Sequence, residues 1–504
     1  MIELSRIEAV LDEPVLAAQI SALEARLPLG IRPRQCSLRT LLVGMLEALC
    51  KGRQVAHLVG VHDALVGLDA PDKVRLGVTA TWRSGPHELT YRQVEYTARL
   101  LVRALGKDAP DGGPSRALQA FADALVETSV PEAYKVASSS YAIDWTDVES
   151  FSRPPAHTDG PCADPEAAFG HRRGDGPGQR DELFFGYYAS AMTMVNDEGG
   201  DVVPELIRRM QLISCRLDPV PSFVTVVTAS AANGVVLSEV LADSGYSYKV
   251  AEHFALPLRS AGVSLAMDLH PNDRGTKGTY AGAILWNGNC YCPATPPALF
   301  ELGPLSRGAS EAETALHDEK AAEIARYKLG RLTRDDRDGY HRVCCPAAAG
   351  KCRCPLRPES MALASARPEI FSPPEQPPHC CTQHTVTVPP EVNAKTAQRH
   401  DYTSAAWRRS YARRSAGERA NSRLKDPAGI NIDQKGWCKL MGLTPLGLFL
   451  ACACVVVNFG LVDAFEARRG RVMRDDADEN RPRQRRRRRR TLAELARATA
   501  NAPP

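Results

Sequence analysis

The chain has 504 residues and a hydrophobic content of 44 %, which allows a sizeable core and makes two or three domains a reasonable expectation. Its fifteen cysteines cluster instead of spreading, and "MIELSRIEAVLDEPV" lacks the pattern of a signal peptide. These features argue against a secreted disulfide scaffold and favour a reducing compartment. The net charge is only +4, but "RYKLGRLTRDDRDGYHR", "WRRSYARRSAGER" and "RPRQRRRRRR" concentrate basic residues after residue 325. Such local patches matter more for polyanion binding than the total charge.

Residues 1–135 are expected to form a helical N-terminal domain. Apolar residues recur at helical spacing in "SLRTLLVGMLEALCKGRQVAHLVGVHDAL", with Gly60 as the expected break. The stretch "PSRALQAFADALVETSV" predicts another amphipathic helix. The pattern suits a plain helical bundle and also a helix-turn-helix, so both interpretations stay open.

From residue 136 to 285 the pattern changes to that of an α/β core. Strands are predicted at "SSYAIDWTDVESF", "ELFFGYYASAMTMV" and "VSLAMDL", and the β-branched runs "FVTVVTAS" and "GVVLSEVLADSGYS" also suit strands. Helices are predicted at "VPELIRRMQLI" and at "YKVAEHFALPLRSAG", the second ending at its Gly. The Pro- and Gly-rich segment 152–181 is expected to be a surface loop. Strands alternating with helices indicate an α/β fold.

Residues 286–394 are rich in Pro and Cys and are expected to form an inserted module with little regular structure. The second part of the core follows at 395–470, and the charged tail 471–504 is expected to be disordered. Within the core, the apolar run Leu446–Val462 is interrupted by Asn458 and is shorter than the ~20 residues of a membrane span. We therefore expect a buried core helix in a soluble protein with no membrane partner.

Two of the predicted strands end on an acidic residue. Asp144 ends the apolar run in "YAIDWTD", where Asp147 and Glu149 are its rivals, and Asp243 follows the strand in "VLADSGYS", where Asp268 is the rival. Active sites of open α/β sheets are built at strand ends, although an Asp there can also be a simple turn cap. Glu418 arrives from a much later helix. Three such carboxylates are what a pair of hard divalent cations, Mg²⁺ or Mn²⁺, requires.

The helix around Glu418 carries the most specific motif. In "YARRSAGERANSRLK", Tyr411, Arg414, Glu418 and Lys425 follow one another at steps of three, four and seven, which return to one face of a helix. This Y-x2-R-x3-E-x6-K pattern resembles the signature of the IS4-type DDE transposases. The strands before Asp144 and Asp243 are similar to those that carry the family's first and second Asp. The resemblance covers roughly residues 136–465, although the cysteines of the insertion depart from the family's pattern.

The resemblance implies an RNase H-like core interrupted by the insertion, with a helical N-terminal domain that binds DNA ends. It implies cut-and-paste transposition by an enzyme whose metal ligands are Asp144, Asp243 and Glu418, and which needs no covalent protein–DNA intermediate. Tyr411, Arg414 and Lys425 would contact DNA near the scissile phosphate. Implied partners are double-stranded DNA, as terminal inverted repeats and target, and a second copy in a homodimer on paired ends. The implied location is the bacterial cytoplasm, with the nucleoid. A metal-dependent nuclease without strand transfer and an inactive, transposase-derived DNA-binding protein stay open as alternatives.

Three further features have two interpretations each. Trp407 lies four residues before Tyr411 and suits base stacking as well as core packing, whereas core packing is preferred for Trp145. The run Arg485–Arg490 suits non-specific DNA binding or a tail without function. Structural zinc would organise the Pro-rich insertion, with free thiols as the alternative. The candidate zinc ligands are Cys290, Cys292, Cys344, Cys345, Cys352, Cys354, His379, Cys380, Cys381 and His384.

Overall fold

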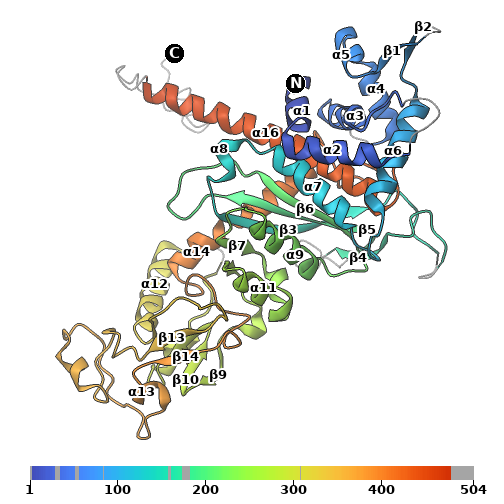
Figure 1. Cartoon of the computed structure of the whole chain (residues 1–504). Helices are drawn as coiled ribbons and strands as arrows, with labels where there is room; N and C mark the ends of the chain where they lie inside the picture. The colour runs from blue at the N-terminus through green and yellow to red at the C-terminus, as the bar shows by residue number, and fades with distance from the viewer. Residues whose placement is uncertain are drawn as a thin grey trace, which may run out of the picture. The chain divides into compact units, whose positions relative to one another are not determined.

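The computed structural model describes residues 3–28, 34–51, 56–82, 85–156, 160–172, 182–306 and 308–477. The chain divides into two compact units, Met1–Phe459 and Gly460–Pro504 (Figure 1). The predicted disordered tail lies outside the described residues, except that 471–477 are helical and so correct that prediction at its start. Its arginine run is entirely outside them. The first unit contains every candidate site residue.

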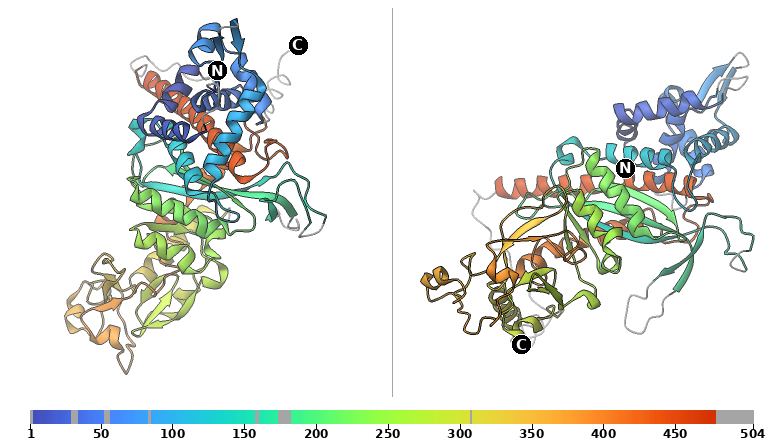
Figure 2. Two further views of the ribbon diagram at one scale, coloured as in Figure 1. Left: turned by 45° about the vertical axis from the view of Figure 1, so that its right-hand side comes forward. Right: turned by 60° about the horizontal axis from the view of Figure 1, so that its bottom comes forward.

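The N-terminal region is helical, as predicted, and Figure 2 shows its helices packed together next to the central sheet. Two predictions within it were wrong. A short antiparallel hairpin, β1 (Thr79–Trp82) with β2 (Gly85–Glu88), interrupts the helices. Gly60 lies inside a helix, because the His57 Nδ1 atom accepts a hydrogen bond from the Gly60 N–H at 2.8 Å and caps the helix start. The helices are α1 (Leu4–Leu11), α2 (Pro14–Arg26), α3 (Leu38–Cys50), α4 (Leu58–Val66), α5 (Ala70–Arg75), α6 (Tyr91–Gly106), α7 (Arg116–Thr128) and α8 (Glu132–Lys135).

A mixed six-stranded sheet forms the centre of the unit. Its order is β4-β5-β3-β7-β8, with β6 also paired to β5. The β3–β7 and β7–β8 pairs are parallel and the other pairs are antiparallel. The fold is therefore a mixed α/β protein with a helical N-terminal region. The strands are β3 (Ser140–Glu149), β4 (Ala168–Arg172), β5 (Glu182–Val195), β6 (Ile207–Ser214), β7 (Glu239–Ala242) and β8 (Ser264–Met267).

Helix and strand were predicted the wrong way round in two consecutive segments. Residues 207–214, expected to be helical, form β6, whose residues are all buried; Glu127 on α7 pairs with Arg208 and Arg209 there. The β-branched run after it forms helix α9 (Pro219–Ala232), which starts where the Asp218 side chain accepts a hydrogen bond from the Val220 N–H at 3.0 Å. Packing and capping outweigh intrinsic propensity in both segments.

Two smaller differences concern the same region. The expected surface loop 152–181 contains β4, which pairs with the start of β5. The expected helix 248–262 is split into a short 3₁₀ turn (Ala251–His253) and α11 (Ala255–Ser260), because Phe254 leaves the helical conformation between them. Gly262 ends this segment with a φ of +78°, as its sequence position predicted.

Asp123, on the α7 face near β6, provides a test of pH-dependent stability. Burial raises the pKa of its carboxyl from 3.8 to about 6. Because the folded pKa exceeds the unfolded one, this group favours folding at low pH and loses that contribution as pH rises through about 6. We expect Asp123→Asn to be about 1–2 kcal/mol more stable than wild type near pH 8 and to lose this advantage near pH 4, in thermal unfolding scans. An equal gain at both pH values would contradict this explanation.

The insertion is more regular than the sequence predicted, which corrects the expectation of an irregular module. It contains helix α12 (Glu311–Ala325), short helix α13 (His379–Thr382) and two three-stranded antiparallel sheets, the first of which begins ten residues before the expected boundary at 286. Buried cysteines fill part of two small apolar clusters between these elements. The first sheet consists of β9 (Thr276–Tyr280), β10 (Ala283–Trp286) and β11 (Asn289–Tyr291), and the second of β12 (Gly330–Arg331), β13 (His341–Cys344) and β14 (Val386–Val388).

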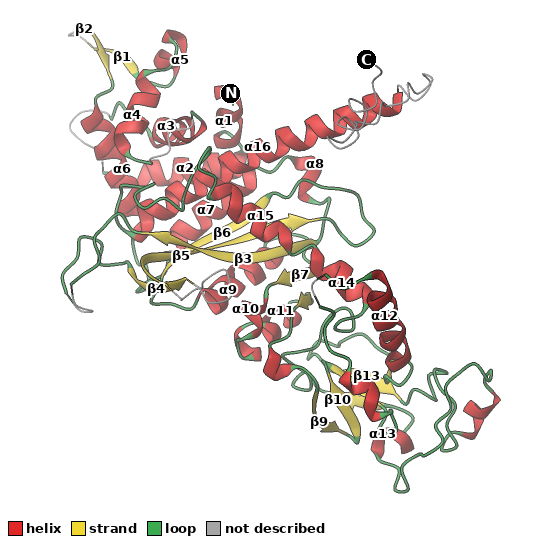
Figure 3. Cartoon of the chain, turned by 180° about the vertical axis from the view of Figure 1, so that it is seen from behind, coloured by secondary structure: helices red, strands yellow, loops and turns green. Residues whose placement is uncertain are grey.

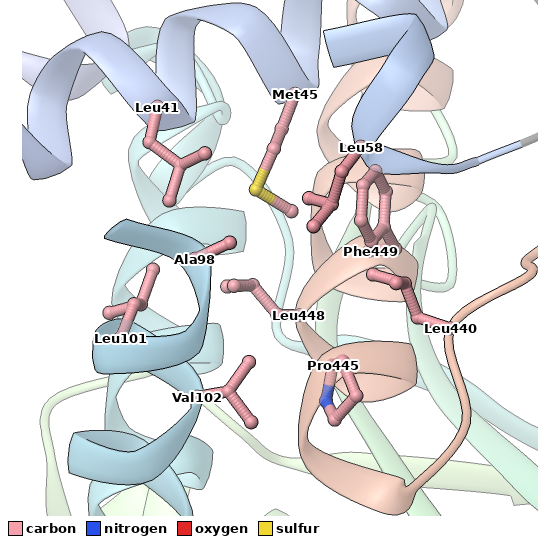
Figure 4. A pocket seen from close by; sticks show the side chains of 10 residues that line it. All are labelled: Leu41, Met45, Leu58, Ala98, Leu101, Val102, Leu440, Pro445, Leu448 and Phe449. Carbon is pink, nitrogen blue, oxygen red and sulfur yellow. The ribbon is translucent and has the colours of Figure 1, made fainter. Parts of the chain in front are cut away.

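The chain returns to the sheet through α14 (Ala405–Ala412), α15 (Ser415–Leu424) and the long helix α16 (Leu443–Ala477). Helices α7 and α15 and the start of α16 cover one face of the sheet, and α9 lies on the other (Figure 3). Figure 4 shows an apolar cavity where the start of α16 meets the N-terminal helices, so these distant segments share one core. It is lined by Leu41, Met45, Leu58, Ala98, Leu101, Val102, Leu440, Pro445, Leu448 and Phe449.

Helix α16 is long and apolar enough to cross a membrane by length and composition, but 83 % of its apolar window is buried inside the protein. A mostly buried core helix also meets this criterion of length and composition. A buried core helix is what the sequence predicted for this run. Asn458, which interrupts the run, is fully buried and bonds both the N–H and the C=O of Ile207 at 2.8 Å. Its amide thus satisfies the backbone at the start of β6, which explains a polar residue in an apolar helix.

Candidate active site

Three aspartates lie in one row where the parallel strands β3, β7 and β8 meet. Ile143 pairs with Ala242, and Ala242 pairs with Met267. The residue that follows each of these three positions is an Asp, namely Asp144, Asp243 and Asp268. Parallel strands point their carboxyl ends to the same edge of a sheet, where α/β proteins place their sites. The structure therefore brings Asp144 and Asp243 together, with the rival Asp268 on the far side of Asp243.

Asp144 is held by two neutral donors. Its Oδ1 accepts from the Trp145 N–H at 2.9 Å, and its Oδ2 accepts from the Asn421 side-chain amide at 2.9 Å. Burial raises the pKa of its carboxyl to about 7, and the nearby negative charges of Asp243 and Glu418 add to the increase. The cation of Arg414 offsets this only in part. Asp144 is thus the centre of an acidic group whose negative charge is only partly balanced by the surrounding protein.

Asp243 follows β7 and caps the short helix α10 (Ser244–Ser247). Its Oδ1 accepts from the Gly245 N–H at 2.8 Å, and burial raises the pKa of the carboxyl. A side chain at position 245 would place its Cβ 2.6 Å from the Trp145 ring, so Gly245 lets the turn approach β3 closely. Trp145 also packs edge-on against the buried ring of Tyr246, at 4.8 Å between centroids. This is the packing role that the sequence predicted for Trp145.

Glu418 reaches the site from a helix pair and not from the single helix that the sequence predicted. Between α14 and α15 the backbone forms turns with hydrogen bonds three residues apart. The Arg414 N–H donates to the carbonyl of Tyr411, and the Gly417 N–H donates to the carbonyl of Arg414. Gly417 permits this approach, because a Cβ there would lie 3.0 Å from the Cβ of Asp144. The Glu418 side chain is 56 % exposed and forms an ion pair with Arg414 at 2.6 Å.

Tyr411 and Trp407 form an aromatic stack next to these carboxylates. Their ring centroids are 4.8 Å apart with an interplanar angle of 10°. The guanidinium of Arg414, which pairs with Glu418, lies 5.2 Å from the Tyr411 ring centroid. Trp407 is only 7 % exposed, and its Nε1–H donates to Gln398 at 2.8 Å. Of the two open interpretations of Trp407, its burial supports core packing, and DNA contact remains a prediction.

Lys425, seven residues after Glu418, is engaged with other carboxylates: its Nζ lies 3.3 Å from Asp147 and 3.1 Å from Asp433. Although burial alone would raise the pKa of Asp147, hydrogen bonding to Arg172 and the charge of Lys425 hold it below its ordinary value. Asp147 is thus neutralised by cations, whereas Asp144 is not. This difference supports Asp144 over its rival on the same strand.

Asp268 is likewise already engaged. Its Oδ1 accepts from the Tyr402 hydroxyl and from Arg274, the latter at 3.0 Å. Tyr402 packs edge-on against Trp407, with 4.8 Å between centroids, so Asp268 supports the aromatic stack. Asp243 therefore remains the better candidate. Asn421 was not predicted from the sequence, where its only signal is its position three residues after Glu418.

The donor set of the acidic group fits a hard divalent cation, since Asp144, Asp243 and Glu418 offer only carboxylate oxygens and an excess of negative charge. Among the residues that the structure describes, however, no three His, Cys, Asp or Glu side chains are gathered closely enough to hold a metal ion. Glu418 is paired with Arg414 instead. The same finding covers the insertion, whose cysteines are free and mostly buried, so structural zinc there remains a prediction.

The comparisons with known proteins give no assignment: no model of a protein family matches the chain, and no curated protein matches it. The candidate site consequently rests on the sequence motif and on the geometry described above.

Proposed function

We propose that this protein is a DNA transposase with an RNase H-like core. The observation that carries the proposal is the acidic group at the strand edge. Asp144 and Asp243 follow neighbouring strands, and the charge of Glu418, from a distant helix, acts on Asp144, with Arg414 and Tyr411 next to Glu418. Carboxylates that are only partly compensated, next to an arginine, suit an enzyme that acts on a phosphodiester, because the carboxylates can hold a cation and the arginine can bind the anionic substrate.

The roles of the chain's own residues follow from their positions. Asp144 and Asp243 would hold a divalent cation, Mg²⁺ or Mn²⁺, together with Glu418. When bound, the cation would supply charge neutralisation at the phosphate and activation of the attacking oxygen. Arg414, which is 20 % exposed, can donate to a phosphate oxygen from the rim of the site, and the Tyr411 hydroxyl is a second donor. Lys425 would add positive charge next to this rim.

In this proposal the enzyme hydrolyses DNA at the ends of its element, and the freed 3′-OH then attacks target DNA in the same site. The helical N-terminal region would bind the terminal inverted repeats, and two copies would act on paired ends. The protein would work in the bacterial cytoplasm, on the nucleoid. The acidic group alone is also what a metal-dependent nuclease without strand transfer requires, so the test has to separate cleavage from joining.

The experiment supplies the full-length protein and Mg²⁺ with the DNA that flanks its own coding sequence. In parallel, the protein receives the same DNA pre-cut to expose a 3′-OH end, together with a supercoiled target plasmid. We expect cleavage in the first reaction and joined products in the second. Glu418→Ala should lose both, and Glu149→Gln should retain both as a matched control on a neighbouring carboxylate. Hydrolysis without joining would favour the nuclease, and equal cleavage by wild type and Glu418→Ala would refute the site.

A further inference from the structure

The position of Asn421 relative to Asp144 suggests a role that the motif does not include. Asn421 lies on α15, one turn after Glu418, and is 8 % exposed. With Gly417 it forms the side of α15 that packs on β3, since residues four apart share a helix face. Glu418, in contrast, extends into solvent from the same helix. Helix α15 thus carries one proposed metal ligand, Glu418, and a residue, Asn421, that contacts a second proposed ligand, Asp144.

The surroundings of Asn421 keep its amide in place. Together with Asn421, a small cavity is lined by side chains of β5, β6, α15 and α16, most of them apolar: Ala189, Ala191, Met210, Leu424, Leu450 and Cys454. Against this apolar packing, the hydrogen bond to Asp144 Oδ2 at 2.9 Å provides a polar partner for the amide NH₂. Breaking it would leave a buried donor without its acceptor, which is unfavourable. The side chain is therefore fixed in the orientation that reaches Asp144.

The two carboxylates of β3 show why a neutral donor matters. Asp147 is paired with Lys425 and Arg172, so its charge is already balanced. Asp144 has its two oxygens oriented by the Trp145 N–H and by Asn421, and neither donor carries a charge. A cation in place of Asn421 would satisfy Asp144 and compete with a bound metal. An amide orients the carboxylate without adding a positive charge next to it.

We infer that Asn421 is a positioning residue, which orients the Asp144 carboxylate for a divalent cation without neutralising it. The inference rests on the proposed function for the identity of the cation site but makes a separate prediction. Groups that orient a metal ligand typically contribute roughly 10- to 100-fold to metal affinity. We expect Asn421→Ala to bind Mn²⁺ at least about tenfold more weakly than wild type, as measured by electron paramagnetic resonance of free Mn²⁺ without DNA. In DNA cleavage, kcat should fall with little change in KM for DNA.

A control variant separates positioning from general stability. Asn458 is also a buried asparagine, but its amide bonds Ser129 and the backbone of Ile207, not the acidic group. We expect Asn458→Ala to lower the unfolding temperature and to leave Mn²⁺ affinity unchanged, at a temperature where both variants are folded. If Asn421→Ala does not fold, Asn421→Ser serves instead, because its hydroxyl is too short to reach Asp144. Wild-type Mn²⁺ affinity in a folded Asn421 variant would overturn the inference.

The outcomes for the inference and for the proposed function are distinguishable. Weakened Mn²⁺ binding by Asn421→Ala in a protein that neither cleaves nor joins DNA would support the inference and refute the transposase. Unchanged Mn²⁺ binding by Asn421→Ala in a protein that cleaves and joins DNA would refute the inference and support the transposase. A wild-type protein that binds no Mn²⁺ would refute both.

Discussion

Asp144→Asn is expected to lose cleavage and joining of DNA ends by roughly 10³-fold or more, the scale seen when a member of a catalytic unit is removed. The substitution keeps the shape of the side chain and an acceptor for the Trp145 N–H, but it removes the charge at the centre of the acidic group. DNA binding in gel-shift assays should be unchanged or slightly tighter, because a negative charge near the phosphates is lost. Single-turnover cleavage by the full-length protein is the decisive measurement.

Two companion variants make this prediction specific. Asp147→Asn changes a carboxylate on the same strand that is already paired with Lys425 and Arg172, so it should retain most activity. Asp243→Asn should lose about as much as Asp144→Asn, and the double variant should lose little more, since ligands of one site act as a unit. A folded Asp144→Asn variant that cleaves at the wild-type rate would exclude Asp144 from the chemistry.

Glu239→Gln is expected to destabilise the protein by about 3–5 kcal/mol, the usual effect of breaking a buried ion pair from one side. Glu239 begins β7 and is fully buried. Its carboxylate accepts hydrogen bonds from the Ser140 and Ser410 hydroxyls, at 3.1 and 2.9 Å, and pairs with Arg413 and Arg399. The variant would leave the largely buried guanidinium of Arg413 without its counter-ion, whereas Arg399 keeps Glu198 as a second partner. The midpoint of urea unfolding, followed by circular dichroism, measures the loss.

A double-mutant cycle tests whether the ion pair is the cause. The Glu239→Gln and Arg413→Met variants should be non-additive, because Glu239→Gln leaves Arg413 without this counter-ion and Arg413→Met leaves Glu239 paired with Arg399 alone. Additive effects would mean that the loss of stability does not come from the Glu239–Arg413 ion pair. Arg413 directly precedes Arg414, so Glu239 also ties the junction of α14 and α15 to the sheet. We therefore expect Glu239→Gln to reduce DNA cleavage as well, to a smaller extent than Asp144→Asn.

Local patterns predicted some elements well and others not at all. The runs that form β3, β5, β7 and β8 and the amphipathic helix α7 lie where the sequence placed them. The β-branched run that forms α9 was predicted as a strand, and the amphipathic run that forms β6 was predicted as a helix. Strand β6 is defined by its partner β5 and by the charge of Glu127, and the start of α9 by the Asp218 cap. The strand partner and Glu127 belong to other segments of the chain, so the residues of β6 by themselves do not indicate them.

The sequence by itself determined the candidate residue types, their order along the chain and the local motif around Glu418. Strand ends and helical spacing are local properties, so the residue pattern was enough to propose Asp144, Asp243 and Glu418 as candidates, with Asp147, Glu149 and Asp268 as rivals. Only the tertiary structure decided which carboxylates remain unbalanced. Register places Asp144, Asp243 and Asp268 in one row, while Lys425 and Arg172 neutralise Asp147 and Arg274 engages Asp268. Charge balance depends on distances between remote segments, and these exist only once the sheet and α15 have packed together.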